Sequence, residues 1–241
     1  MSLKQLALKY LPAPILRSIR ARRYQSSLRH YSIAAEPDLL GCKALLNPGD
    51  IVLDIGANIG VYTRFCSEFV GPAGHVHSLE PVPETYSYLV RNVRSLGLTN
   101  VTHYNLAASD QDRSKATMSM PDYATGGPNI YEARISDHGD IPVTTCRIDT
   151  LFPKLSPQLI KCDVEGHELA AINGARELIV RSRPRWLIEV SNSETFDLMS
   201  SLGYQPFVWL QGSFIPKSPS IKVANYFFFP HENPYPVETR S

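Results

Sequence analysis

Two glycines that follow a short apolar run stand where the chain could bind a small molecule. The run Ile51–Ile55 is interrupted only by Asp54, and its residue types predict a buried parallel strand. Gly56 and Gly60 then turn the chain into a helix. Gly56 lets a ligand approach the backbone, and the first N–H groups of a helix are unpaired donors with a partial positive charge. We therefore expect a ligand at this turn, the alternative being a plain strand-to-helix turn.

The spacing of these glycines argues against a nicotinamide dinucleotide. A dinucleotide site needs the pattern G-x-G-x-x-G to seat a pyrophosphate, whereas here the glycines are four residues apart with Asn58 between them. Glu80 follows the alternating segment 75–79, which predicts a second parallel strand. A carboxylate at the end of that strand can accept hydrogen bonds from both hydroxyls of an adenosine ribose, each worth about 1.5–3 kcal/mol. Adenosine without a pyrophosphate suggests S-adenosylmethionine.

Several motifs, in their order along the chain, resemble those of the FkbM-type class I methyltransferases. They are D-I-G-A-N-I-G at 54–60, E-P at 80–81, N-L-A-A-S-D at 105–110, I-K-C-D-V-E-G-H-E at 160–168 and L-I-E-V at 187–190. The glycine motif is shared by many methyltransferases, but its order and spacing with the 160–168 block are specific to this family. The likeness runs from about Pro48 to Tyr204.

The resemblance implies an S-adenosylmethionine site in the first half of the chain. The residues assigned to the cofactor are Asp54, Gly56, Asn58, Gly60, Glu80, Asn105 and Ala107. Asp54 and Gly56 are assigned to its methionine end and Glu80 to its ribose. Asn105 and Ala107 are assigned to the adenine edge. Asn105 has an alternative role as a strand-end residue that bonds to its own loop.

A second group of polar residues predicts the acceptor side of the site. Asp163 and Glu189 end adjacent predicted strands, at the edge where open α/β sheets bind ligands. Lys161 lies two residues before Asp163 on the same strand face. An acceptor hydroxyl needs a base, which accelerates transfer by about 10²–10⁴ fold. Asp163 and His167 are the candidate bases, and Lys161 is the third catalytic candidate.

Glu165 and Glu189 are assigned to acceptor binding. Three further acceptor residues, Tyr123, Asn129 and Tyr131, come from the segment 118–140, which reads as a long loop over the strand ends.

Two alternatives for the acidic cluster remain open. In the first alternative, Asp163 caps the helix that follows it, and Glu165 and Glu168 stabilise that helix by lying near its positive N-terminal end. These residues would then have a structural role and no catalytic one. A divalent ion on Asp163, Glu165 and Glu189 could activate the hydroxyl instead, because hard cations take oxygen ligands. We favour a site without a metal.

The composition is that of one globular domain. The 241 residues carry a net charge of +1, which gives no overall attraction to nucleic acid. Four cysteines show no C-x-x-C pairing and predict free thiols, which favours a reducing, cytoplasmic compartment. We divide the chain into a basic helical arm (1–35), a methyltransferase domain (36–230) and a flexible tail (231–241).

The arm carries seven Lys or Arg residues and no acid before Glu36. Its apolar spacing predicts two short helices, over 3–11 and from Ile15, on either side of Pro12 and Pro14. We expect it to pack on the domain or on a partner subunit in a homo-oligomer. The alternative is a peripheral helix, within residues 1–30, at the inner membrane face near a lipid-linked glycan. A transmembrane span and a signal peptide are not supported. We expect cofactor binding to survive without the arm.

Strand and helix patterns alternate along the rest of the chain. The predicted strands are 51–55, 75–79, 101–106, 141–146, 159–163, 186–190, 207–209 and 225–229, and the predicted helices are 35–46, 63–70, 83–96, 165–180 and 195–202. Such alternation implies parallel pairing with right-handed crossovers. We predict an α/β fold, a Rossmann-like helix-sheet-helix sandwich. The resemblance implies a mostly parallel, seven-stranded sheet with an antiparallel last strand.

The expected function is methyl transfer from S-adenosylmethionine to a hydroxyl of a sugar, glycan or secondary metabolite. The acceptor class comes from the resemblance alone. Two alternatives stay open: N-methylation of a small molecule, and a non-catalytic cofactor-binding partner that uses its basic arm for assembly.

Overall fold

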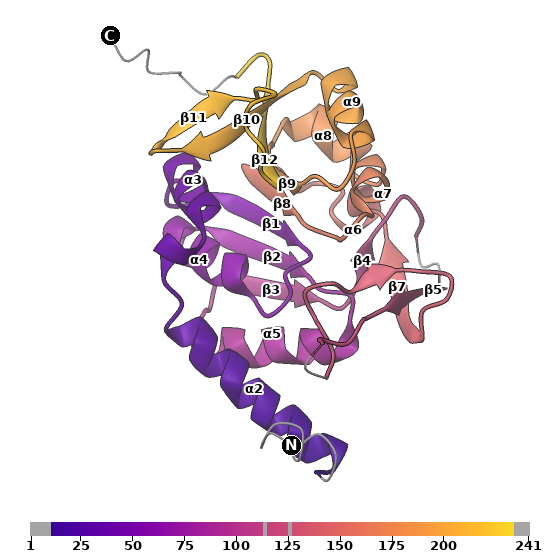
Figure 1. Ribbon diagram of the computed structural model, residues 1–241. Helices are drawn as coiled ribbons and strands as arrows, with labels where there is room; N and C mark the ends of the chain where they lie inside the picture. Colours follow the sequence, from indigo (N-terminus) through magenta and orange to yellow (C-terminus); the bar gives the residue numbers. More distant parts are fainter. Residues whose placement is uncertain (1–10, 113–114, 125–126, 234–241) are drawn as a thin grey trace.

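A central sheet of eight strands organises the molecule, with the order β11-β10-β12-β9-β8-β1-β2-β3 (Figure 1). The computed structural model describes residues 11–112, 115–124 and 127–233. The strands are β1 (Ile51–Ile55), β2 (His75–Leu79), β3 (Val101–Tyr104), β8 (Leu159–Cys162), β9 (Arg185–Glu189), β10 (Tyr204–Leu210), β11 (Ser213–Pro216) and β12 (Asn225–Pro230). The pairs β8-β1, β1-β2, β2-β3 and β8-β9 are parallel, whereas β12 runs antiparallel to β9 and β10, and β11 antiparallel to β10.

Helices cover both faces of this sheet. They are α3 (Pro37–Leu45), α4 (Val61–Val70), α5 (Pro83–Ser95), α6 (Ile148–Leu151), α7 (Glu168–Asn173), α8 (Arg176–Ser182) and α9 (Glu194–Ser201). Consecutive strand residues point to opposite faces. Leu53 therefore packs in the cluster that contains the buried residues of α7, α8 and α9, while its neighbour Val52 packs with those of α3 and α4. Both faces are buried, as the near-continuous apolar strands predict.

The predicted fold class is confirmed, and the differences lie at the sheet edge. The predicted antiparallel pairing of the last strands is present between β10 and β12. β11 is an additional edge strand, since Ser213–Pro216 pairs with Phe207–Leu210. It lies within 211–220, where the prolines predict a hairpin-like excursion. The four cysteines are free and buried, as predicted.

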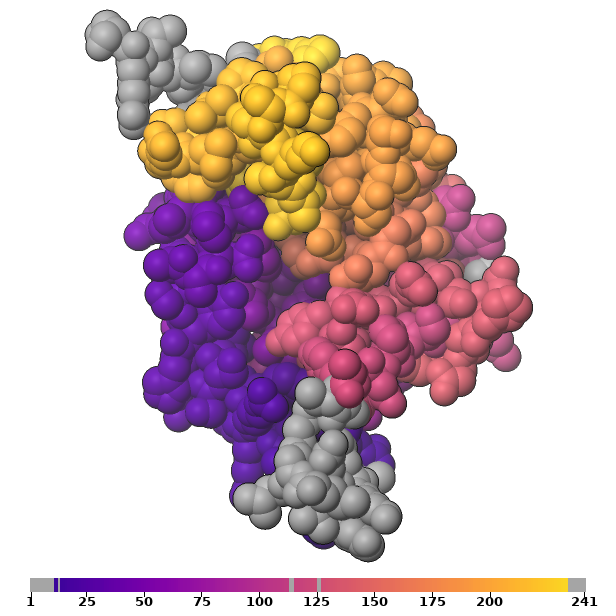
Figure 2. All heavy atoms as spheres, in the orientation of Figure 1, coloured from indigo at the N-terminus to yellow at the C-terminus, as the bar shows by residue number. Residues whose placement is uncertain are grey.

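A second, smaller sheet borders the long loop expected over 118–140. Its order is β4-β7-β5-β6, with β4 at Ala107–Ala108, β5 at Lys115–Ser119, β6 at Arg134–Ile135 and β7 at Ile141–Cys146. Only the end of β5 and the short strand β6 fall within 118–140, so the described residues between β5 and β6 form the long loop, with one isolated bridge between Asp122 and Pro128. Figure 2 shows these residues, in rose, beside the indigo surface of the N-terminal residues.

The single helix predicted over 165–180 is two helices, α7 and α8, that meet at Gly174. A Cβ on Gly174 would lie 1.9 Å from the carbonyl oxygen of Ser109, so only glycine allows this approach. Asp149 then caps α8, because its carboxylate accepts from the backbone N–H groups of Glu177 (3.1 Å) and Leu178 (2.9 Å). The helix pattern in the sequence continues through this break, which is why it was missed.

The described part of the arm contains the helix α2 (Ala13–Arg29), which packs against α5, and the short 3-10 helix η1 (Ile33–Ala35). The ring of Tyr24 lies 5.1 Å from that of Tyr88, and Arg20 pairs with Glu84 at 3.4 Å. The first predicted arm helix over 3–11 falls almost wholly outside the described residues, as does most of the predicted tail. None of the helices that the structure describes has the length and apolarity to cross a membrane.

The ends of β1 and β8 touch through their backbones at Gly56. This residue has a φ of 78°, and a Cβ there would lie 1.7 Å from the carbonyl oxygen of Asp163. The N–H groups of Gly56 and Ala57 both bond to the Leu79 carbonyl, at 3.0 and 2.9 Å. Gly56 therefore lets the ends of β1, β2 and β8 meet. This close approach is a sufficient reason for glycine at position 56, whether or not a ligand binds there.

We predict that Gly56→Ala lowers the free energy of unfolding by at least about 1 kcal/mol more than Gly97→Ala. Both glycines have positive φ (78° and 66°), so both variants carry the left-handed penalty of about 1–2 kcal/mol. A Cβ at Gly97 meets nothing within 4 Å, whereas a Cβ at Gly56 meets the Asp163 backbone. Urea unfolding of the two variants measures the difference. Equal losses would contradict the close contact.

Candidate active site

A cavity of about 440 Å³ opens at the carboxyl ends of β1, β2 and β8. This is the edge where open α/β sheets bind ligands, and the volume lies within the range of small-molecule sites, roughly 300–1,000 Å³. The glycine loop after β1, the Glu80-Pro81 turn after β2 and the 161–167 segment line it. Ala107 and Ala108 of the small sheet, and Ile130 and Tyr131 of its loop, also line it.

Glu80 is a buried carboxylate whose two oxygens both accept backbone hydrogen bonds. Oε1 accepts from the N–H of Val82 and Oε2 from the N–H of Asn58, each at 2.9 Å. Burial raises the pKa of Glu80 to about 7, although both N–H bonds act in the opposite direction. Each carboxylate oxygen has a further lone pair that can accept from a ligand hydroxyl. Glu80 is thus placed to bind a ribose and also to fix the glycine loop.

Asn58 joins the glycine loop to the loop of the small sheet. Its backbone is left-handed, with a φ of 50°, a conformation that asparagine tolerates better than most residues. Its side-chain amide donates to the carbonyl oxygen of Ile130 at 2.9 Å, and its Oδ1 accepts from the N–H of Ile59 at 2.8 Å. Because Ile130 is far away in sequence, no local pattern predicts this contact.

The structure places some of the residues assigned to the cofactor behind the cavity wall. Asp54 does not line the cavity: it is fully buried and accepts a hydrogen bond from the Thr63 hydroxyl at 2.6 Å. Gly60 is also outside the lining, at the start of α4, with a φ of 96°. Asn105 donates its amide to the carbonyl oxygens of Glu80 and Pro81, at 2.9 Å each, so it bonds to the turn after β2 and not to its own loop, the alternative considered for it. Of the seven assigned residues, Gly56, Asn58, Glu80 and Ala107 line the cavity.

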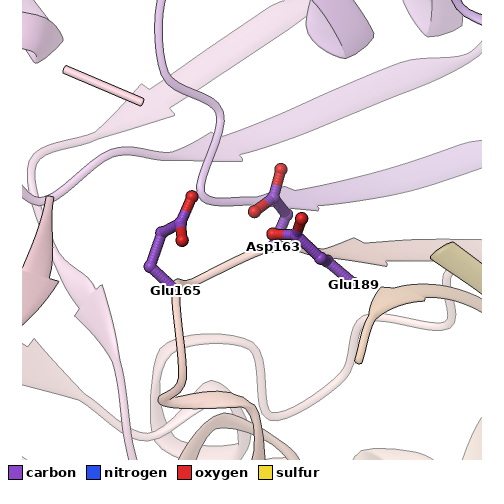
Figure 3. Close-up of side chains that lie close together, drawn as sticks. All are labelled: Asp163, Glu165 and Glu189. Atoms are coloured by element: carbon purple, nitrogen blue, oxygen red, sulfur yellow. The ribbon is translucent and has the colours of Figure 1, made fainter. Parts of the chain in front are cut away.

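On the acceptor side, Asp163, Glu165 and Glu189 lie close together (Figure 3). Each offers a carboxylate oxygen, and these oxygens lie within 4.8 Å of one another. The three come from different places in the fold, since Asp163 and Glu165 follow β8 and Glu189 ends β9. Such oxygens are the ligands that Mg²⁺ or Ca²⁺ prefers, so the arrangement itself leaves the metal alternative open.

Lys161 is the buried cation beside this cluster. Its Nζ lies 3.1 Å from Asp163 and 3.8 Å from Asp54, and it donates to the carbonyl oxygen of Gly56 at 2.8 Å. Burial favours the neutral amine, but the charges of Asp163 and Asp54 outweigh burial and raise the pKa of Lys161. Lys161 therefore stays charged. Its three partners hold it in place, so it cannot act as a base.

Asp163 and Glu189 titrate as a pair. Burial and the hydrogen bond with Asp163 raise the pKa of Glu189 to about 8. Burial raises the pKa of Asp163 as well, but the charge of Lys161 and the bond with Glu189 outweigh it and leave that pKa below its ordinary value. The opposite directions of the two pKa shifts favour the proton on Glu189 and the charge on Asp163. Asp163 lines the cavity.

Asp163 is not a helix cap. α7 begins at Glu168, and its N-cap position is occupied by His167, so the capping alternative for Asp163 is wrong. Glu168 is fully buried and accepts from the N–H of Gly166 at 2.8 Å. His167 lines the cavity, with Nε2 3.1 Å from the Ser109 hydroxyl. Burial lowers the pKa of His167, so its ring is neutral and remains a second candidate base.

The acceptor residues predicted in the 118–140 segment separate in the structure. Tyr131 lines the cavity. Asn129 is buried and turns inward, where its Oδ1 accepts from the N–H of Tyr131 at 3.2 Å. Tyr123 is exposed at the surface and does not line the cavity.

Sequence reasoning missed the contribution of the arm. Three residues near the end of α2 line the cavity. Ser27 lies in the last turns of α2, and Tyr31 and Glu36 follow the helix. The arm thus contributes to the cavity wall, while the survival of cofactor binding without the arm stays a prediction. These residues lie outside the motifs, so only the packing of α2 on α5 brings them to the cavity.

The fold is that of the class I methyltransferases. The structure is similar to a crystal structure of the methyltransferase FkbM from Methylobacillus flagellatus KT, with a TM-score of 0.53 and 17% identity, over 90% of this chain and 60% of that one. Residues 54–206 match the model of the methyltransferase FkbM domain. The chain therefore belongs to the FkbM methyltransferase family, whose enzymes use S-adenosylmethionine.

Two relatives of established name are similar to shorter parts of the chain. The hexuronic acid methyltransferase AglP of Haloferax volcanii is 31% identical over 131 residues, which cover 52% of this chain and 49% of that protein. A protein-L-isoaspartate O-methyltransferase of Ignicoccus hospitalis is 39% identical over 59 residues, 24% of this chain and 28% of that protein. The chain thus matches about half the length of the first relative and less of the second.

We predict that Glu80→Ala weakens S-adenosylmethionine binding more than tenfold, because two charge-assisted bonds to the ribose are worth about 3 kcal/mol or more. Calorimetry with S-adenosylhomocysteine and its 2′-deoxy and 3′-deoxy analogues separates this loss from movement of the Asn58 loop. Loop movement weakens all three ligands equally. Loss of the ribose contact abolishes the preference for ribose over deoxyribose, and a preference retained in the variant would remove Glu80 from that role.

Proposed function

We propose that the protein transfers the methyl group of S-adenosylmethionine to a hydroxyl group of a sugar or glycan and forms a methyl ether. The observation that supports this proposal is the Asp163–Glu189 pair, an ionised carboxylate and its protonated neighbour at the cavity. A hydroxyl is a poor nucleophile while it keeps its proton, so a fixed carboxylate beside it is the group that the reaction needs. The name of the Haloferax relative supports a sugar-derived acceptor.

In this proposal the residues after β1 and β2 hold the cofactor. Glu80 accepts from the ribose hydroxyls, the Gly56-Ala57-Asn58 backbone faces the methionine part, and Ala107 lies at the adenine edge. Cofactor and acceptor meet above the end of β8, where in-line positioning alone removes roughly 7–11 kcal/mol of barrier. The protein forms no covalent intermediate.

Asp163 accepts the proton of the acceptor hydroxyl as the oxygen attacks the methyl carbon. Lys161 is a positioning residue: its charge keeps Asp163 ionised. Two alternatives use the same wall of the cavity. His167 is a second candidate base, and a divalent ion on Asp163, Glu165 and Glu189 would activate the hydroxyl directly.

We predict that Asp163→Asn lowers turnover at least about a hundredfold while S-adenosylhomocysteine affinity changes little, because a positioned base is lost and the neutral product does not depend on its charge. Steady-state rates and calorimetry on the same preparation measure both. His167→Gln is the matched variant. A hundredfold loss of turnover in His167→Gln, together with near-normal turnover in Asp163→Asn, would assign the base to His167. Activity lost with a chelator and restored by magnesium would instead support the metal alternative.

The bond that forms can be identified without knowing the acceptor. We expect label from methyl-tritiated S-adenosylmethionine to enter a glycan extract of the host cells and to withstand mild alkali. Hot hydroiodic acid should then release it as volatile iodomethane, since it cleaves methyl ethers readily. Release by alkali as methanol would mean a methyl ester, and resistance to both treatments would mean N-methylation. Cofactor binding without any transfer would favour the non-catalytic alternative.

A further inference from the structure

The wall of the cavity carries more carboxyl groups than one proton transfer requires. The acidic residues that line it are Glu36, Glu80, Asp163, Glu165 and Glu189. Among the described lining residues, Lys161 is the only Lys or Arg, and it is engaged with Asp163, Asp54 and the Gly56 carbonyl. His167 is neutral, because burial lowers its pKa. The lining therefore offers no unengaged positive group to an anionic ligand.

Glu165 is the member of this set whose role is unexplained by the proton transfer. Its carboxylate receives no hydrogen bond from any described residue, whereas Asp163 is paired with Lys161 and Glu189. Its backbone is left-handed, with a φ of 51°, and Gly166 follows at 95°. Glutamate is unfavourable in this conformation, where glycine or asparagine is preferred. Strain of this kind tends to occur at functional positions.

Strand geometry places Glu165 at the methyl-transfer end of the cavity. Glu80 follows β2 and Asp163 follows β8, with β1 between them. Neighbouring strands lie about 4.8 Å apart, so about 10 Å separate the ribose-binding end from the carboxylates. A cofactor whose ribose is at Glu80 can therefore extend its sulfonium toward Asp163, Glu165 and Glu189.

We propose that Glu165 is a charge-selecting residue, which favours the positive sulfonium of S-adenosylmethionine over the neutral thioether of S-adenosylhomocysteine. This inference rests on the proposed function, since it takes the sulfonium to be at that end. The attraction between two opposite unit charges about 6 Å apart, here the sulfonium and the Glu165 carboxylate, would raise the affinity for the cofactor on the order of a hundredfold at an effective dielectric constant of about 20. Water in an open cavity reduces this, so we expect about tenfold.

Charge selection of this kind also favours release of the product. In the transfer the carbon–sulfur bond breaks and its electron pair goes to sulfur, while the acceptor oxygen bonds to the methyl carbon. The hydroxyl proton goes to Asp163. The cofactor thus loses its positive charge and Asp163 its negative charge in one step. The attraction that held the substrate cofactor is then absent for the product.

Calorimetry with three ligands tests the inference. S-adenosylmethionine carries the sulfonium charge, S-adenosylhomocysteine lacks it, and the S-carboxymethyl sulfonium analogue adds a carboxylate where the methyl group would be. We expect the wild type to bind S-adenosylmethionine at least about tenfold more tightly than either of the others. Glu165→Gln should narrow both ratios by about fivefold or more. Glu177→Gln, an exposed glutamate on α8 outside the cavity, is the matched control and should leave both ratios unchanged.

The outcomes separate this inference from the proposed function. Equal wild-type affinities for the three ligands, or ratios that persist in Glu165→Gln, would overturn charge selection alone. Failure of the wild type to bind either S-adenosylmethionine or S-adenosylhomocysteine would overturn the proposed function and this inference with it. Glu165→Asn provides a second variant if the glutamine variant folds poorly, because asparagine tolerates the left-handed backbone at this position.

Discussion

The contact between the Gly56 backbone and the Asp163 carbonyl is the constraint on which the rest of the site depends. It fixes the distance between the ends of β1 and β8, so the loop that we assign to the cofactor and the segment that we assign to the acceptor meet without a side chain between them. The same approach brings the Gly56 carbonyl within 2.8 Å of Lys161. A residue larger than glycine would separate the strand ends and take Lys161 away from one of its partners.

Hydrogen bonds of Glu80 and Asn58 connect the glycine loop to its neighbours on both sides. The Glu80 carboxylate holds the N–H of Asn58, and the Asn58 amide holds the Ile130 carbonyl in the small sheet's loop. The glycine loop is therefore tied to β2 on one side and to the loop on the other. The Ile59, Tyr88 and Ile130 cluster, in which α2 buries Ala21, packs against the same region. The cavity is thus built by strand ends, and its outer wall is held by packing that involves the arm.

The sequence predicted the parts of the structure that follow from local pattern. Apolar runs gave the parallel strands, and motifs gave Glu80 and the carboxylates at the correct sheet edge. It could not show that Asp54 bonds inward to Thr63, because a strand residue's direction depends on register. Nor could it place Ser27 and Tyr31 in the cavity, since only tertiary packing of α2 brings them there. The break at Gly174 was missed because its cause, the Ser109 carbonyl, is distant in sequence.

The buried charges explain why the site can accept a proton without losing its internal pairing. Removing one partner from a buried ion pair is costly, because a charge is then left uncompensated. Lys161 avoids this, since it has carboxylates on both sides: Asp163 faces the cavity and Asp54 lies in the core. When Asp163 takes a proton, Lys161 keeps Asp54 and the Gly56 carbonyl as partners. Asp54, which does not line the cavity, therefore acts in the proposed reaction through Lys161: it keeps the buried cation paired whether Asp163 is ionised or protonated.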